Sequence, residues 1–187
     1  MPLIESNYKP KGWLKYGHLQ TIYPSFFRKI YFGYDERQRI TLSDGDFLDL
    51  DWKRNDNDKL VVLCHGLEGS SSSTYILGMA KHLSDNGFDI LAINYRSCSG
   101  EMNINMRFYH HGATDDLNEV MPHCADYRNI HLMGFSLGGN LALKYVGEDI
   151  FEKPKNLKSV TAFSVPIDLE DCVQEIHKVK NQIYVQN

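Results

Sequence analysis

The 187-residue chain is 42% hydrophobic and 12% aromatic, enough to bury one substantial core and too little for two full domains. Its 20 basic and 24 acidic residues give a formal charge of −4, and no basic block could neutralise a run of phosphates, so no nucleic-acid partner is expected. The sequence shows neither a secretory leader nor an apolar run of about 18 residues, so we expect a cytoplasmic protein without a transmembrane segment.

The N-terminal segment, residues 1–35, is rich in Tyr, Trp and Phe, but glycines and prolines interrupt it and no hydrophobic period is sustained. We predict an aromatic arm that lies on the domain. The next runs, Gln38–Leu42 and Phe47–Trp52, resemble strands and flank Ser43-Asp44-Gly45-Asp46. Asp-Gly between two strand-like runs is a strong hairpin signal, so an antiparallel pair should open the sheet.

The middle of the chain alternates between strand and helix signals. Leu60–Cys64 is a short continuous apolar run, typical of a strand that is covered on both faces. Tyr75–Asn86 has apolar residues at helical spacing and is followed by Gly87, a favourable C-terminal cap. A further strand is predicted over Phe88–Ile93.

The alternation continues toward the C-terminus. Thr114–Ala125 has helical spacing, with acidic residues in its first turn, where the helix dipole favours them. A strand over Asn129–Met133, a helix over Leu137–Val146 and a strand over Leu157–Phe163 follow. Such alternation predicts an α/β fold, with an open, mostly parallel sheet and helices on both faces.

The four cysteines stand far apart, and no Cys-x-x-Cys spacing typical of a zinc site or redox pair is present. No pair of histidines has metal-ligand spacing either. We therefore expect reduced, partly buried thiols, no metal and no cofactor. The cysteines are Cys64, Cys98, Cys124 and Cys172.

A Gly-x-Ser-x-Gly turn, Gly134-Phe135-Ser136-Leu137-Gly138, joins the strand at 129–133 to the helix at 137–146. Strand, turn and helix in this order resemble the nucleophile elbow of α/β-hydrolases, in which the serine projects from a cramped turn and glycines avoid collisions. We therefore predict that Ser136 is a nucleophile. The other interpretations are an ordinary glycine-rich loop and a nucleotide-binding loop, and the segment lacks the Gly-x-Gly-x-x-Gly or Gly-Lys-Ser/Thr pattern of the latter.

A second loop, His65-Gly66-Leu67-Glu68-Gly69, follows the buried strand at 60–64, where α/β-hydrolases place an oxyanion donor. By that placement, the backbone N–H of Leu67 joins that of Leu137 in an oxyanion hole. Acyl transfer needs such donors because negative charge develops on the carbonyl oxygen as the tetrahedral intermediate forms. We interpret His65 as a residue that orders the loop, since the base of this fold follows the serine in sequence.

Further segments extend the resemblance over nearly the whole chain: Gly17–Thr21, His65–Ser70, Asn94–Glu101, Tyr109–Gly112 and Gly134–Asn140. Together they resemble the YheT-like branch of the α/β-hydrolase superfamily, also called the AB hydrolase 4 family. That family has Gly where this chain has Ser97, and a small residue where it has His111. The resemblance implies a serine hydrolase of carboxylic esters, including lipid-like or short acyl esters, with a Ser-Asp-His triad and no metal.

The remaining histidines before the serine have two interpretations. Those in the family-like motifs either line the mouth of the site or order surface loops, and they are His18, His110 and His111. Those on predicted helices or strands are expected to be structural, and they are His82, His123 and His131.

The acid and base of a triad are expected after the serine, in the order Ser, Asp or Glu, His. Only His177 follows Ser136, and Asp168 precedes His177 by nine residues, too few to contain the strands and helices that bring both side chains to the serine. Phe163–Leu169 resembles the segment that enters the family's cap, and Glu175–Val185 resembles the start of a cap helix. The chain is therefore expected to stop before the last two strands, with the triad Asp and His beyond residue 187.

These observations divide the chain into an N-terminal arm (1–35), an α/β-hydrolase core (36–165) and the start of a cap (166–187). The predicted function is esterase-like or lipase-like hydrolysis of a small-molecule or lipid-like ester through an acyl-enzyme on Ser136. Two alternatives stay open. One is a catalytically incomplete fragment or non-enzymatic interaction module, and the other is an acyltransferase or peptidase that uses the same elbow.

Overall fold

The computed structural model describes residues 3–10, 12–179 and 181, and it divides into two compact units, Met1–Tyr31 and Phe32–Asn187. The first unit contains a short 3-10 helix, η1 (Gly12–Lys15), and a helix, α1 (Gly17–Phe27). The sequence did not predict α1, because it begins at a glycine and contains Pro24. Ring contacts support it: the Tyr23 ring lies 4.8 Å from that of Trp13 and 4.9 Å from that of Phe27, centroid to centroid.

The second unit contains a six-stranded sheet with the strand order β1-β2-β4-β3-β5-β6. Strands β1 (Glu36–Thr41) and β2 (Phe47–Lys53) form an antiparallel pair in which Ile40 lies opposite Leu48. The predicted Asp-Gly hairpin is confirmed, and Gly45 has a φ of 82°, which a glycine adopts without strain.

The other four strands are parallel to one another, and β2 pairs antiparallel with the first of them in the sheet order, β4. They are β3 (Lys59–Cys64), β4 (Asp89–Asn94), β5 (Asn129–Phe135) and β6 (Leu157–Phe163). All four lie within a residue or two of their predicted positions. The predicted α/β class with a mostly parallel sheet is therefore confirmed.

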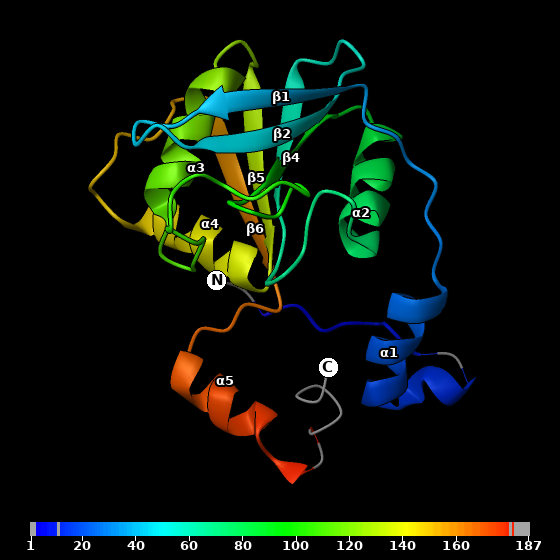
Figure 1. Ribbon diagram of the computed structural model, residues 1–187. Helices are drawn as coiled ribbons and strands as arrows, with labels where there is room; N and C mark the ends of the chain where they lie inside the picture. Colours follow the sequence, from blue (N-terminus) through cyan, green and yellow to red (C-terminus); the bar gives the residue numbers. More distant parts are fainter. Residues whose placement is uncertain (1–2, 11, 180, 182–187) are drawn as a thin grey trace. The chain divides into compact units, whose positions relative to one another are not determined.

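Helices cover both faces of the sheet (Figure 1). Helix α2 (Thr74–Ser84) lies on one face, whereas α3 (Thr114–Val120) and α4 (Leu137–Gly147) lie on the other. Two bonds close the end of α2, from Gly87 N–H to the Ser84 carbonyl and from Phe88 N–H to the Leu83 carbonyl. With a φ of 82°, Gly87 is the predicted cap of a Schellman motif.

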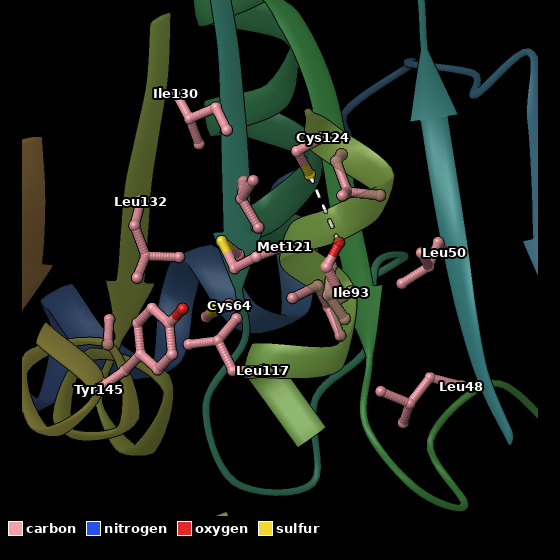
Figure 2. Close-up of a cluster of buried hydrophobic side chains, with 14 of the residues drawn as sticks. Leu48, Leu50, Cys64, Ile93, Leu117, Met121, Cys124, Ile130, Leu132 and Tyr145 are labelled. Atoms are coloured by element: carbon pink, nitrogen blue, oxygen red, sulfur yellow. Dashed lines mark hydrogen bonds between the residues drawn. The ribbon is translucent and has the colours of Figure 1, made fainter. Parts of the chain in front are cut away.

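The core lies on both sides of β3, whose residues from Leu60 to Cys64 are at most 1% exposed. Its alternate side chains enter different layers, as expected for a strand buried on both faces. Val61 and Leu63 pack in the layer of α2, while Leu60, Val62 and Cys64 pack in the layer of α3 and α4. Figure 2 shows this second layer, where Leu132 of β5 and Leu117 of α3 approach Cys64.

The predicted helix over 114–125 changes character partway. Helix α3 ends at Val120, and a 3-10 turn, η2, continues over Met121–Cys124. Pro122 explains the change, because proline has no N–H to continue the α-helical hydrogen bonds. The turn keeps Met121 and Cys124 buried in the core (Figure 2).

The four cysteines are free, as predicted, and Cys64 and Cys124 are buried. Burial raises the pKa of the Cys64 thiol to about 12, so this thiol stays protonated at neutral pH. Over the described residues, no helix combines the length and apolar character that crossing a bilayer requires.

After β6 the chain forms helix α5 (Leu169–Ile176), with Asp168 as its N-cap. The sequence predicted a helix over Glu175–Val185 instead. In that range residue 180 and residues 182–185 lie outside the described residues. The displacement has a local cause, since the Asp168 carboxylate accepts a hydrogen bond from the Asp171 N–H and starts the helix six residues earlier.

Candidate active site

Ser136 occupies the turn between β5 and α4 with φ 51° and ψ −118°, a conformation that non-glycine residues rarely adopt. Such a conformation costs about 1–3 kcal/mol and persists only where the surroundings hold it. Two hydrogen bonds hold this one, from Ser136 N–H to the Phe163 carbonyl (2.8 Å) and from Asn140 N–H to the Ser136 carbonyl (3.0 Å). Ser136 is nevertheless exposed.

The two glycines of the motif allow the backbone to pack closely around the serine. A Cβ at position 134 would lie 2.3 Å from the Gly138 carbonyl oxygen. A Cβ at position 138 would lie 2.4 Å from the carbonyl oxygens of Cys64 and His65. Gly138 therefore lets the first turn of α4 touch the end of β3, which brings the two predicted motifs together.

The loop at 65–69 lies beside the serine, since a Cβ built on Gly66 would be 3.3 Å from the Ser136 Cβ. Two tyrosine hydroxyls hold this loop. The Tyr75 hydroxyl accepts a hydrogen bond from the Gly66 N–H (2.8 Å), and the Tyr109 hydroxyl accepts one from the Glu68 N–H (2.7 Å). The amide of Leu67 stands between these two anchored amides.

Two backbone donors remain available beside the serine. Within 3–10, 12–179 and 181, no residue accepts a hydrogen bond from the N–H of Leu67 or from that of Leu137. Leu137 is the first residue of α4, so its N–H also carries the positive end of the helix dipole. The structure thus brings the loop at 65–69 and the start of α4 together beside Ser136.

The buried His65 side chain contacts the backbone of its own loop and of Tyr95. It is 1% exposed, its Nδ1 lies 2.7 Å from the Gly66 carbonyl oxygen, and its Nε2 accepts a hydrogen bond from the Tyr95 N–H. Burial lowers the pKa of His65 to about 4, so the ring is neutral near pH 7. Its contacts agree with the interpretation of His65 as a loop-ordering residue.

The other histidines of the second unit have contacts of their own. His110 Nδ1 accepts a hydrogen bond from the Gly112 N–H, and His111 is exposed. His131 lies 2.8 Å from the Ser159 hydroxyl, which joins β5 to β6, and His123 lies 3.4 Å from the Gln38 side chain. His82 is exposed on α2, and His18 belongs to the first unit.

Asp168 and His177 stand at opposite ends of α5. Asp168 caps the N-terminus, and His177 follows the last turn, where its Nδ1 lies 2.8 Å from the Val173 carbonyl oxygen. Helical rise over nine residues separates them by about 13 Å, so the two side chains cannot form an acid–base pair. Within the described residues, no group of His, Cys, Asp and Glu side chains could hold a metal ion.

Sequence reasoning missed several polar contacts between distant segments. Arg96 is 1% exposed, and its guanidinium binds the Asp116 carboxylate through two nitrogens at 2.8 and 2.7 Å. It also contacts Asp44 at 2.8 Å and Asp46 at 3.2 Å, so the hairpin turn is tied to α3. No local pattern indicated these contacts. Tyr109 stood in a family-like motif, but nothing in the sequence pointed to Tyr75.

A family model described as the alpha/beta hydrolase fold matches residues 59–183. Among curated proteins, the chain is similar to YheT of Escherichia coli (strain K12), an esterase by name, with 32% identity over 174 residues. That match covers 89% of this chain and 51% of YheT. It is also similar to bovine (Bos taurus) phospholipase ABHD3, with 31% identity over 96% of this chain and 46% of the relative.

The chain thus spans about half the length of the curated relatives that it matches. Among solved structures, it is similar to the Pyrococcus furiosus esterase Pf2001, with a TM-score of 0.65 and 22% identity. This match covers 98% of the chain and 66% of the esterase, and at this identity it shows a shared fold.

Proposed function

The chain belongs to the α/β-hydrolase family, in its YheT-like branch, and from this membership we propose a serine hydrolase of carboxylic esters with Ser136 as its nucleophile. One observation carries the proposal: an exposed serine is held at a positive φ beside two backbone N–H groups, those of Leu67 and Leu137, that lack an acceptor among the described residues. Strain of this kind is characteristic of functional turns.

In the proposed reaction, the Ser136 hydroxyl oxygen attacks the ester carbonyl carbon, and the negative charge on the carbonyl oxygen is stabilised by the Leu67 and Leu137 amides. One such donor is worth about 2.7–4 kcal/mol of transition-state stabilisation. The alcohol then leaves with a proton, and water releases the acyl group from the serine. The exchange needs no metal, because the amides polarise the carbonyl.

The serine hydroxyl needs a base, because it stays protonated at neutral pH. His65 is buried and hydrogen-bonded within its own loop, and His177 closes the end of α5. We therefore propose that the triad Asp and His lie outside these 187 residues, and that residues 166–187 begin the cap. A cytoplasmic location stays a prediction.

The names of two relatives narrow the proposed substrate. One is a phospholipase, ABHD3, and another is the human monoacylglycerol lipase ABHD2, 27% identical over 86% of this chain. Both names refer to lipid substrates, phospholipids in one case and monoacylglycerols in the other. We therefore propose a lipid-like ester as the substrate, in preference to a small polar one.

Covalent labelling with a fluorophosphonate probe tests the nucleophile in the full-length protein. Ser136→Ala should abolish labelling, because it removes the attacking oxygen. Ser164→Ala is a matched control, since Ser164 also has a positive φ, 52°, and follows the neighbouring strand β6. Labelling that survives Ser136→Ala would exclude Ser136 as the nucleophile.

A second candidate, a non-enzymatic interaction module, is favoured by the position of β6. This strand ends the sheet and, within the described residues, pairs with β5 alone, and an unpaired edge promotes association. Light scattering would then show oligomers of the 187-residue chain. A monomer that unfolds cooperatively and turns over p-nitrophenyl esters would contradict this candidate. Acyl transfer to an added alcohol in place of water would identify the acyltransferase alternative.

A further inference from the structure

The first unit, Met1–Tyr31, differs in charge from the rest of the chain. It contains five basic residues and one acidic residue, a formal charge of +4, whereas the other 156 residues contain 15 basic and 23 acidic residues, a charge of −8. It also contains seven of the 22 aromatic residues of the chain. A basic, aromatic segment is therefore joined to an acidic domain.

The apolar side chains of α1 are exposed along one face of the helix. Leu19, Tyr23, Phe26 and Phe27 follow the spacing i, i+4, i+7, i+8, which places them on a single stripe. Their exposed fractions are 38%, 43%, 75% and 65%, in that order. Trp13, which is 51% exposed, packs edge-on against Tyr23 and extends the stripe. A surface helix of a globular protein usually buries such a stripe against the core.

Basic side chains stand at both ends of this stripe. Lys15 precedes α1 and its Nζ lies 5.2 Å from the Tyr16 ring centroid, while Arg28 and Lys29 follow the last turn. The opposite side of the helix is polar, with Thr21 and Ser25 hydroxyls bonded back to the helix backbone. Aromatic and aliphatic residues on one face with cations at the margins match the chemistry of a bilayer surface.

We propose that residues 12–29 bind the surface of a lipid bilayer that contains anionic lipids. The stripe would enter the boundary between headgroups and acyl chains, and the lysine and arginine side chains would reach the lipid phosphates. The helix would lie in the plane of the membrane, because 11 residues span only about 16 Å, half of a bilayer core of about 30 Å. The positive charge selects the anionic surface over a neutral one.

Vesicle binding by the full chain tests the proposal, with Ser136→Ala as background so that binding is measured without turnover. The probes are vesicles of phosphatidylcholine alone and vesicles in which about 30% of the lipid is phosphatidylglycerol, which is anionic. The chain has two tryptophans, and Trp52 is fully buried, so Trp13 reports on the first unit. We expect a blue shift of its emission with anionic vesicles, weakened by salt and absent in Trp13→Phe.

Matched variants separate this surface from non-specific adhesion. Phe26→Ser with Phe27→Ser should reduce binding, measured by co-sedimentation, at least tenfold, whereas Phe108→Ser, at a 61% exposed position in the second unit, should leave it unchanged. Arg28→Gln and Lys29→Gln should each weaken binding about fivefold, and Lys155→Gln and Lys158→Gln should not. All these positions are exposed, and circular dichroism verifies that each variant folds.

Absence of binding to anionic vesicles at low salt would overturn the proposal, as would equal binding to neutral vesicles or unchanged binding in the Phe26 and Phe27 variant. If the aromatic stripe binds a protein partner instead, no binding to anionic vesicles is expected. The outcome does not depend on the proposed hydrolase, because Ser136→Ala removes the nucleophile from every sample. Loss of labelling and loss of vesicle binding are therefore separate results.

Discussion

At the scale of single residues, burial decides the protonation state of His65. Its pKa is lowered to about 4, mainly because the charged ring would lose its hydration inside the protein. In the unfolded chain the pKa returns to its usual value of about 6.5. The folded state therefore binds fewer protons than the unfolded state between these two pH values, and folding is linked to pH.

The linkage gives a prediction with a definite sign. The contribution of His65 to stability is fully present above about pH 6.5 and is lost as pH falls toward about 4, by roughly 3 kcal/mol. In His65→Asn, the urea-measured free energy of unfolding should lose this part of its pH dependence. Wild-type and variant curves that run parallel between pH 4 and 6.5 would contradict the assignment. His82→Asn, at an exposed position, serves as the control.

At the same scale, Ser97 is a non-glycine residue in a backbone conformation that favours glycine. The family resemblance implies glycine at this position, and the structure gives Ser97 a φ of 61°, which favours glycine. Two hydrogen bonds with the Asn103 side chain and backbone hold the strained residue, at 2.5 and 3.2 Å. The contacts with Asn103 therefore accompany the serine at a position where glycine would be free of strain.

At the scale of elements, the contact between α4 and β3 sets the position of the serine. Gly138 is the residue that permits it, since any side chain there would meet backbone oxygens on β3 and its following loop. Backbone atoms cannot move aside as a flexible side chain can, so the whole turn would shift. The serine and the loop at 65–69 would then separate.

Gly138→Ala should destabilise the protein by about 3 kcal/mol and reduce fluorophosphonate labelling of the fraction that remains folded. Gly147→Ala, at the other end of the same helix, is the matched control, because a Cβ there meets nothing within 4 Å. That control should change stability by less than about 1 kcal/mol, in the stabilising direction. Equal midpoints for the two variants in urea would show that the close contact is unimportant.

At the scale of the whole molecule, the two units differ in whether they contribute residues to the hydrophobic core. Both core clusters consist of residues from Phe32 onward, and none of the described residues of the first unit is buried. The second unit therefore contains its own core. The described contacts within the first unit include the hydrogen bonds of α1 and the ring contacts of Tyr23 with Trp13 and Phe27.

A chain that lacks residues 1–31 should therefore fold, with a free energy of unfolding within about 1 kcal/mol of the intact chain. It should also lose vesicle binding. Leu63→Ala, which creates a cavity at a fully buried position, is the contrasting variant and should cost about 2–5 kcal/mol. Loss of the cooperative urea transition on deletion would show that the first unit belongs to the core.

The sequence by itself determined the features that depend on neighbouring residues. A continuous apolar run predicted β3, Asp44-Gly45 predicted the hairpin, and the glycine spacing around Ser136 predicted a cramped turn. Each follows from local sterics and from the period of burial, which are visible within about ten residues.

Only the tertiary structure decided which residues far apart in the sequence contact one another. Arg96 meets Asp44 from 52 residues away and Asp116 from 20, and Tyr109 holds the Glu68 amide from 41. Helix α1 was not predicted because Gly17 and Pro24 are unfavourable in a helix, whereas in the structure ring contacts such as that between Trp13 and Tyr23 accompany it. Such pairings depend on where the folded backbone crosses itself, and a single sequence carries no local pattern for them.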